Sequence, residues 1–504
     1  MNEDETELQK LIGKWLFVAS VLGFTVFLST RISNIAGGAD PSCYLELNRM
    51  FMNGKLTVEM RQVGTIPFEE FPRNAYVSIG LREMEEGYLQ GPTAFPGYPL
   101  VISALDVFFP QELAVWLSIL LISAGVCIVT YLLIRSHGLS PSWACFGSAA
   151  MGLSPIMAII GAMPIADYLS CLLALACWLL STEAHKGKWI ALGLGACLGL
   201  AVITRPNNLM FFAPVIVTLL FNLKKQEWWW VIGAGGLPFA GFLFWFNNAV
   251  YGSPFVTDYD RHKDDFGAEH VWPTIEQFSI WMWDSILPVA FILLPLSVVF
   301  IKGRVRDVTT LWAWIIAIFA LPAFFSEARG QFWNLRYTLP AWPAILLGAA
   351  IGGAGLIRFA TNRWKRTGWL HWLSIAIAIS AGVFGVNKSR GMHLYGFKQN
   401  ESANLHMADW INENTQDSDV LLAFQVSGTV QYYTDRAFLR WERLESEHWK
   451  RLKQNSVDEG YRIYAVIFVY EFKDAETLGK RFPGKWEGKA TFGAYTVYEL
   501  STPN

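Results

Sequence analysis

Charge is scarce in this chain. Asp, Glu, Lys and Arg make up 16% of its 504 residues, and the formal net charge is −2. Without a basic stripe or a net positive charge, the sequence gives no electrostatic footprint for binding nucleic acid. Hydrophobic residues make up 53% of the chain, and the mean hydropathy is +0.30. This composition indicates a protein that crosses a membrane several times and excludes an ordinary soluble enzyme.

Cysteine and clustered histidine are also scarce. Five of the six cysteines fall in apolar runs, so no disulfide framework can be derived. The eight histidines are scattered and no HExxH motif occurs, so we expect no metal and no cofactor. The acidic residues 1–7 are followed by no small-residue cleavage site, and we therefore expect the first apolar run to be retained as a span. No internal repeat is visible, which disfavours secondary transporters without excluding them.

What the sequence has in abundance is apolar runs long enough to cross a bilayer. There are eleven such runs. Because several are short or contain Gly and Pro, the expected number of transmembrane helices is given as about eleven. The chain is thus predicted to be a polytopic α-helical membrane protein. The predicted spans are 14–35, 112–134, 143–161, 164–181, 189–204, 208–223, 228–247, 285–301, 308–326, 339–357 and 370–387.

The distribution of cations predicts the orientation. With the N-terminus in the cytoplasm, the short outer connections carry only Arg205, Arg329 and Arg336. This strong asymmetry follows the positive-inside rule, and the odd number of predicted spans then places the C-terminal segment outside. We expect the protein to lie in the inner (plasma) membrane of the cell. The cations of the cytoplasmic connections are Arg135, Lys186, Lys188, Lys224, Lys225, Lys302, Arg304, Arg306, Arg358, Arg363, Lys365 and Arg366.

Three long segments fall on the outer side: about 36–111, about 248–284 and the tail. The tail changes character, since short predicted strands (420–424, 463–469, 494–500) alternate with predicted helices (403–414, 445–453). We therefore expect a transmembrane catalytic domain over 1–389, including the first outer loop at 36–111. We expect an extracytoplasmic α/β domain over 390–504, for which a packing role without chemistry is the favoured interpretation.

Polar side chains collect on the predicted outer face. Asp40 follows the first span, Asp167 begins the fourth, Arg205 lies between the fifth and sixth, and Arg329 and Arg336 lie between the ninth and tenth. Each has a structural interpretation: an Asp-Pro pair that starts a helix, an ion pair at helix ends, or an arginine that snorkels. Five such residues on one face favour a site, because ionisable groups at a membrane must be compensated.

The chemistry that such a set could perform is specific. Guanidinium groups bind phosphate through planar bidentate contacts, most strongly where water is scarce. A neighbouring carboxylate stays ionised and can serve as general base toward a hydroxyl or amine. With a sugar on polyprenyl phosphate as donor, the leaving group is already an anion, which needs cationic stabilisation more than a general acid.

Short motifs carry a resemblance to a known family. They are Gly38-Ala39-Asp40-Pro41-Ser42-Cys43-Tyr44 with Asn53-Gly54-Lys55-Leu56, Phe95-Pro96-Gly97-Tyr98-Pro99-Leu100, Ala166-Asp167, Arg205-Pro206, and Tyr251-Gly252-Ser253-Pro254 with Arg336-Tyr337. In these motifs the chain resembles the glycosyltransferase C (GT-C) superfamily, polytopic enzymes that use lipid-linked sugars. Within it, the chain is similar to bacterial relatives of the protein O-mannosyltransferase and aminoarabinose transferase group. It departs from them at Pro41, where relatives often have a second acidic residue.

The resemblance implies an inverting transferase that moves a sugar from polyprenyl phosphate to a glycan, lipid or protein acceptor. The reaction would take place at the extracytoplasmic face of the membrane and would need no metal. Asp40 matches the catalytic base of the first loop. Asp167 matches the acidic residue of the second loop and would be a catalytic residue that orients the acceptor or Asp40. The donor phosphate would bind at Arg205, Arg336 and Arg329, and the candidate substrate contacts are Tyr44, Tyr98, Tyr251 and Tyr337.

Two other classes remain open. A transporter or flippase would bind the lipid phosphate without breaking it, but it would need charges along a path at mid-bilayer, where the spans have few. A non-catalytic membrane scaffold would use the tail domain to bind a partner. In that case Asp40→Asn should leave the cellular phenotype intact.

Overall fold

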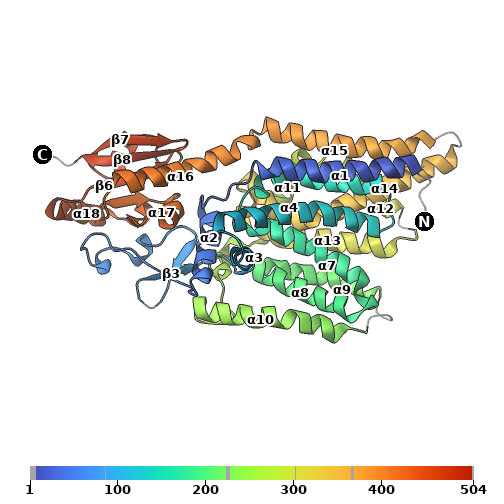
Figure 1. The fold of residues 1–504 in the computed structure, drawn as a ribbon, viewed down its shortest axis with the longest axis horizontal. Coiled ribbons are helices and arrows are strands. Elements are labelled where there is room, and N and C mark those ends of the chain that lie inside the picture. The colour runs from blue at the N-terminus through green and yellow to red at the C-terminus, as the bar shows by residue number, and fades with distance from the viewer. Residues whose placement is uncertain (1–6, 86, 223–226, 301, 365–367, 502–504) are drawn as a thin grey trace. The chain divides into compact units, whose positions relative to one another are not determined.

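Figure 1 shows the computed structural model of the chain, which describes residues 7–85, 87–222, 227–300, 302–364 and 368–501. The cytoplasmic cations predicted at Lys224, Lys225, Lys365 and Arg366, and the segment ends at 223 and 301, lie outside the described residues. By internal contacts the chain divides into two compact units. The helical unit comprises Met1–Ile32, Trp116–Phe246 and Pro254–Tyr395. The mixed unit comprises Ser33–Val115, Asn247–Ser253 and Gly396–Asn504.

The helical unit is a bundle whose long helices run roughly alongside one another (Figure 1). Two of them, α4 and α10, have one end in the mixed unit. The α-helices are α1 (Glu7–Ser29), α4 (Gln111–Ser136), α5 (Pro141–Gly152), α6 (Pro155–Ile160), α7 (Ala166–Glu183), α8 (Lys188–Thr204), α9 (Phe212–Leu220), α10 (Trp229–Tyr251), α11 (Val271–Ser285), α12 (Val289–Val299), α13 (Val305–Phe324), α14 (Trp342–Arg363) and α15 (Trp372–Gly391). The 3-10 helices are η3 (Ala184–Lys186), η4 (Pro206–Phe211), η6 (Asp258–Asp265), η7 (Ala268–His270), η8 (Ser326–Arg329), η9 (Phe332–Ala341), η10 (Gly368–His371) and η11 (Leu394–Gly396).

Within the described residues, each of the eleven predicted spans overlaps one helix or a pair of consecutive helices. Among the described residues, seven helices are long and apolar enough to cross a bilayer, or eight with a bent pair. In that pair Ala268–Ser285 and Val289–Val299 differ in direction by 110°. The polytopic helical class is therefore confirmed, whereas the number eleven stays a prediction.

The first span ends earlier than predicted. We expect it to run to residue 35, but α1 ends at Ser29. The Ser29 and Thr30 hydroxyls donate to the carbonyls of Val26 and Phe27, at 2.7 and 2.8 Å. Ser and Thr hydroxyls that bond to nearby carbonyls compete with the backbone hydrogen bonds of a helix, and they favour helix ends and turns.

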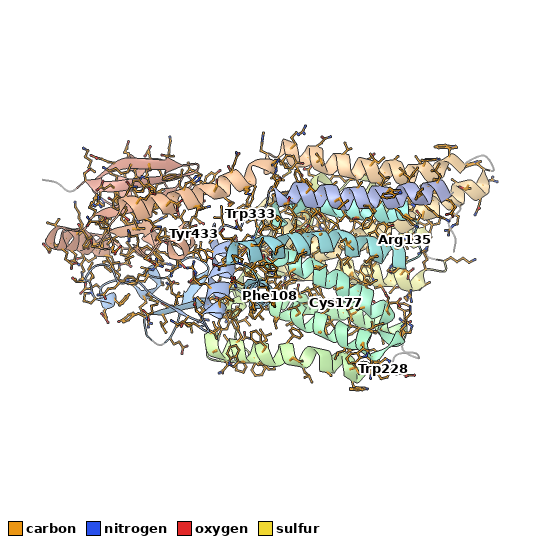
Figure 2. All side chains as sticks on the ribbon, in the orientation of Figure 1. Phe108, Arg135, Cys177, Trp228, Trp333 and Tyr433 are labelled. Carbon is orange, nitrogen blue, oxygen red and sulfur yellow. The ribbon has the colours of Figure 1, made fainter. Side chains whose placement is uncertain are left out.

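The six cysteines all lie within the described residues and are free thiols. Cys177, labelled in Figure 2, lies on α7 inside the bundle and is fully buried. These cysteines behave as small apolar side chains that fill the helical packing.

The mixed unit combines the first loop with the tail. Its helices are α2 (Ala39–Met52), α3 (Gly97–Asp106), α16 (Phe397–Asn414), α17 (Ser427–Tyr433), α18 (Ser446–Glu459), α19 (Ala475–Arg481) and the 3-10 helices η1 (Phe68–Glu70), η2 (Arg73–Ala75) and η12 (Trp441–Arg443). A small antiparallel sheet has the order β1 (Val58–Glu59), β3 (Leu89–Pro92), β2 (Leu81–Glu83). A larger sheet has the order β5 (Ala437–Leu439), β4 (Val420–Ala423), β6 (Ile463–Phe468), β8 (Tyr495–Ser501), β7 (Lys485–Phe492).

The tail is the α/β segment that the sequence predicts. Strands β4, β5 and β6 are parallel, and β6, β8 and β7 are antiparallel. The predicted strands correspond to β4, β6 and β8, whereas β5 and β7 were not predicted. Strand β5 has only three residues, and charged Lys485, Glu487 and Lys489 obscure the apolar pattern of β7.

The predicted domain boundary near residue 390 lies close to Tyr395–Gly396, where the chain passes from the helical to the mixed unit. The first loop packs with the tail in the mixed unit. Assignment of that loop to one catalytic domain with the spans stays a prediction.

Candidate active site

A buried ion pair joins two helix ends in the helical unit. Asp167 lies in the first turn of α7, where the helix dipole favours a carboxylate. Arg205 follows α8 in an extended conformation, as expected for a residue before proline. The Arg205 guanidinium donates to Oδ1 of Asp167, and the two side chains are 14% and 4% exposed. With so little water around them, the pair is screened far less than a surface ion pair.

A second arginine faces the same carboxylate. Arg336 lies on η9, and its Nη1 is 4.0 Å from Oδ2 of Asp167. The guanidinium carbons of Arg205 and Arg336 both lie 5.4 Å from the centre of the Tyr337 ring. An aromatic face attracts guanidinium groups, so Tyr337 helps to hold both arginines at one place. We call Asp167, Arg205, Arg336 and Tyr337 the arginine cluster.

The charge of the arginine cluster indicates its chemistry. Two guanidinium groups and one carboxylate carry a net single positive charge, because arginine stays protonated in proteins. The side chain of Arg336 is 15% exposed, so the charge is largely withdrawn from water. An added anion with one negative charge would neutralise the cluster, which makes it suited to binding a phosphodiester.

The turn after Arg205 is fixed by Asn208. Its side-chain amide donates to Ser170 on α7 at 3.0 Å and to the carbonyl of Ala201 on α8 at 2.8 Å. Asn208 therefore ties η4 to the same two helices that carry Asp167 and Arg205. The sequence analysis did not single out Asn208, although it lies two residues after the Arg205-Pro206 motif.

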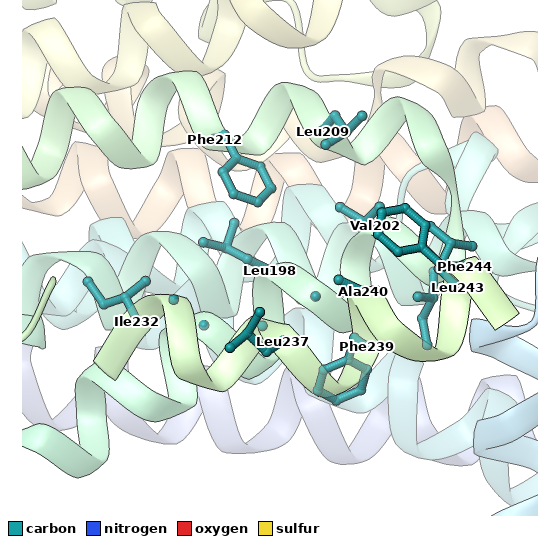
Figure 3. A pocket seen from close by; sticks show the side chains of 15 residues that line it. Leu198, Val202, Leu209, Phe212, Ile232, Leu237, Phe239, Ala240, Leu243 and Phe244 are labelled. Atoms are coloured by element: carbon teal, nitrogen blue, oxygen red, sulfur yellow. The ribbon is translucent and has the colours of Figure 1, made fainter. Parts of the chain in front are cut away.

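An apolar groove lies beside the end of α8 (Figure 3). It has a volume of about 440 Å³ and is lined entirely by apolar residues and glycines of α8, η4, α9 and α10. Val202 and Ile203, in the last turn of α8, belong to its wall, and Arg205 follows them in the chain. Phe212 and Leu237 line it from the neighbouring helices.

Glycines bring α8 and α10 together next to this groove. A β-carbon at Gly195 would lie 1.9 Å from the carbonyl oxygen of Ile232, and one at Gly235 would lie 2.3 Å from that of Leu192. The two backbones are therefore in contact, as small residues permit in membrane helices. The spacing of Gly195 and Gly199 is a signal for this contact that the sequence interpretation did not use.

Asp40 lies in the first turn of α2, in the mixed unit, and is partly exposed. The helix begins after Gly38, whose φ of 67° is in the left-handed region. Burial, with a smaller contribution from the Asp40 charge, raises the pKa of the Cys43 thiol on the same helix to about 12. Cys43 is therefore a neutral neighbour of Asp40 at physiological pH.

Three predicted tyrosines lie in the mixed unit. Tyr44 and Tyr98 pack edge to face at 5.7 Å and are 8% and 1% exposed. The Arg82 guanidinium lies over the Tyr251 ring at 4.8 Å, and Tyr251 is 8% exposed. These contacts show packing around α2 and the end of α10, and the role of the tyrosines as substrate contacts stays a prediction.

The structure thus brings four predicted residues into the arginine cluster and places Asp40, Tyr44, Tyr98 and Tyr251 in the mixed unit. Arg329 is exposed at the end of η8, and its role at the donor phosphate stays a prediction. The predicted convergence of Asp40 with the arginines on one face also stays a prediction. Among the described residues, His, Cys, Asp and Glu form no group of three that could hold a metal ion.

No protein-family model and no curated protein matches the sequence. Solved structures do match. ArnT from Cupriavidus metallidurans bound to undecaprenyl phosphate is 15% identical, with a TM-score of 0.60 over 97% of this chain and 99% of that one. The chain has the GT-C fold.

Two further solved structures share the GT-C fold with this chain. Archaeal oligosaccharyltransferase AglB from Archaeoglobus fulgidus, in complex with an inhibitory peptide and a dolichol-phosphate, is 13% identical, with a TM-score of 0.52 over 98% of this chain and 74% of that one. Arabinofuranosyltransferase AftD from Mycobacteria is also 13% identical, with a TM-score of 0.51 over 97% of this chain and 40% of that one. The GT-C fold predicted from the short motifs is therefore confirmed.

Proposed function

We propose that the chain is a membrane glycosyltransferase that moves a sugar from a polyprenyl-phosphate donor to an acceptor at the extracytoplasmic face. The observation that carries this proposal is the arginine cluster, in which a largely buried carboxylate is shared by two guanidinium groups. The GT-C fold supports it, because ArnT and AglB, which have this fold, were solved with undecaprenyl phosphate and dolichol-phosphate.

The arginine cluster suits the donor better than a free polyanion. The phosphate of a polyprenyl-phosphate sugar is a phosphodiester with one negative charge, which balances the single positive charge of the cluster. After transfer the polyprenyl phosphate is a monoester with additional negative charge, and two guanidinium groups stabilise that developing charge. The cluster would therefore interact more strongly with the transition state, in which this charge develops, than with the intact donor, which is the requirement for catalysis.

The apolar groove of the helical unit is suited to the lipid part of the donor. Its walls offer no hydrogen-bonding side chain, and its volume of about 440 Å³ suits several isoprene units and not a whole polyprenyl chain. Because its wall includes Val202 and Ile203, the lipid would enter near Arg205, with the phosphate toward the guanidinium group and the isoprene units along α8 and α10.

The transfer step assigns the remaining residues. An acceptor hydroxyl or amine attacks the anomeric carbon, Asp40 takes its proton, and the bond from that carbon to the phosphate oxygen breaks. Attack opposite to the leaving phosphate inverts the anomeric centre. Asp167 orients the arginines, Arg329 is an additional phosphate contact, and Tyr44, Tyr98, Tyr251 and Tyr337 border the substrates. The step needs no metal, since the guanidinium groups supply the positive charge.

Replacing Arg336 by alanine tests the donor site. We expect polyprenyl phosphate to bind more weakly by about 1.5–3 kcal/mol, the usual contribution of a hydrogen bond to a charged group. Arg336→Lys should recover only part of the affinity, because an ammonium cannot reproduce the planar fork. Binding is measured by titrating purified protein in detergent with polyprenyl phosphate.

The matched control is Arg363→Ala, which removes an exposed arginine at the end of α14. This variant should bind the lipid with wild-type affinity. If Arg336→Ala also binds with wild-type affinity, then the phosphate does not bind at the arginine cluster and the proposed donor site is wrong.

A further inference from the structure

The segment that carries Asp40 is held by side chains of the tail. Both backbone polar groups of Ala36 are bound by α17: the Thr429 hydroxyl donates to the Ala36 carbonyl at 2.8 Å, and the Ala36 amide donates to the Tyr433 hydroxyl at 3.0 Å. Ala36 and Thr429 are fully buried. Figure 2 shows Tyr433 at the end of α17. A short helix from the far end of the sequence thus fixes the backbone four residues before Asp40.

The same helix also contacts the chain just after Asp40. A β-carbon at Gly428 would lie 2.2 Å from Oγ of Ser42, so the backbone of α17 rests directly on the first turn of α2. The Ser42 hydroxyl donates to the carbonyl of Gly38 and, at 3.1 Å, to that of Ala39. Asp40 therefore lies between two points that α17 holds, one at Ala36 and one at Ser42.

Helix α16 supplies a third contact, at Gly37. A β-carbon there would lie 2.0 Å from Oε2 of Glu401 and 2.9 Å from Nδ2 of Asn404. Asn404 also accepts a hydrogen bond from Thr429 at 3.3 Å, which links α16 to α17. Burial raises the pKa of Glu401 to about 7, in keeping with a carboxyl group enclosed between α16 and the glycines.

The far end of α2 is held as well. Arg49 donates to the carbonyl of Tyr432 at 3.0 Å, and its guanidinium carbon lies 3.8 Å from the centre of the Tyr432 ring. Helix α2 is therefore attached to α17 at both ends. A rotation of α2 that moved Asp40 would have to break contacts at Ala36, Ser42 and Arg49 together.

We infer that the C-terminal α/β segment positions Asp40, with Thr429 as the positioning residue and Gly428 as the contact that sets the distance between α17 and α2. The inference rests on the proposed function, in which Asp40 is the general base. The tail then takes part in the reaction without touching a substrate. Its contribution is geometric, because a displacement of about 1 Å at a reacting group can lower a rate by on the order of 10²-fold.

The test uses the isosteric variant Thr429→Val in the full-length protein, with Thr429→Ser as the variant that keeps the hydroxyl. Thr429→Val removes the hydroxyl, and with it the bonds to Ala36 and Asn404, with little change in volume. We expect faster amide hydrogen exchange in residues 36–43 and a kcat lower by about 10-fold to 10²-fold, with an unchanged donor KM. Thr429→Ser should restore both the exchange rate and kcat.

Two further variants complete the test. Gly428→Ala forces Ser42 away from α17 and should lower kcat by about 10²-fold. Thr491→Val, at an exposed position of β7, is the matched control and should behave like the wild type. A merely structural role for Thr429 would reduce the amount of folded protein but would leave kcat per donor-binding molecule unchanged.

Amide hydrogen exchange and turnover together distinguish a failure of this inference from a failure of the proposed function. If exchange in residues 36–43 stays at the wild-type rate in Thr429→Val, α17 does not hold this segment and the inference is overturned. It is equally overturned if exchange rises while kcat stays normal and Asp40→Asn is inactive, and the proposed function then stands. If Asp40→Asn itself retains transfer, the assignment of the base fails and the inference fails with it.

Discussion

Asp40→Asn should lower the turnover of sugar transfer by about 10²–10⁴-fold, the usual contribution of general-base catalysis. Asparagine keeps the size and most of the hydrogen bonding of aspartate but has no basic electron pair. The partly exposed first turn of α2 should tolerate the change, so folding and donor binding should survive. Turnover is measured with purified, monodisperse protein in nanodiscs and a lipid-linked donor.

Two variants sharpen this result. Asp40→Glu keeps the charge but moves the base by roughly 1 Å, and it should lose on the order of 10²-fold. Asp409→Asn removes an exposed carboxylate from α16 and should turn over at the wild-type rate. A folded Asp40→Asn protein with near-wild-type turnover would rule out Asp40 as the general base.

Asp167→Ala should produce the largest loss of stability, about 3–5 kcal/mol in the free energy of unfolding, because it breaks a buried ion pair. It leaves Arg205 and Arg336 beside one Tyr337 ring without the carboxylate between them. Adding polyprenyl phosphate should restore part of the loss, since the phosphate replaces the missing negative charge. Unfolding in detergent, followed by tryptophan fluorescence, measures both effects.

The control is Asp284→Ala in the same unit. Asp284 pairs with Lys388 at 2.6 Å, but its side chain is 45% exposed, so its loss should cost at most about 1 kcal/mol. Equal losses in the free energy of unfolding would show that the buried Asp167 pair contributes no more to stability than the exposed Asp284 pair. If polyprenyl phosphate stabilised neither the wild type nor Asp167→Ala, the cluster would not be an anion site.

The helical class and the four residues of the arginine cluster could be predicted, because their signals are local in the sequence. Apolar runs of sufficient length specify membrane helices, and charges at the ends of these runs mark positions where helices meet the membrane surface. Asp167 begins one helix and Arg205 follows the next, so a short α7–α8 hairpin brings them together. Their ion pair was one of the structural interpretations left open from the sequence, and the structure confirms it.

The contacts that hold Asp40 could not be predicted in the same way. Thr429 and Ala36 are 393 residues apart, and a threonine in a seven-residue helix has no sequence pattern that points to its partner. The apolar groove was equally hidden, because its lining residues read only as parts of membrane helices. The end of α1 at Ser29 was predicted too late, because the apolar residues Ile32 and Ile35 follow it in the sequence.

The measurement that tests the central claim most directly follows both products in nanodiscs that contain a polyprenyl-phosphate-linked sugar and a mixture of candidate acceptors. Our account predicts that the wild-type protein releases polyprenyl phosphate and attaches an equal amount of sugar to an acceptor, and that Asp40→Asn does neither while still binding the donor. A wild-type protein that binds the donor or moves it across the bilayer with the sugar–phosphate bond intact would contradict the account and favour a flippase or a scaffold.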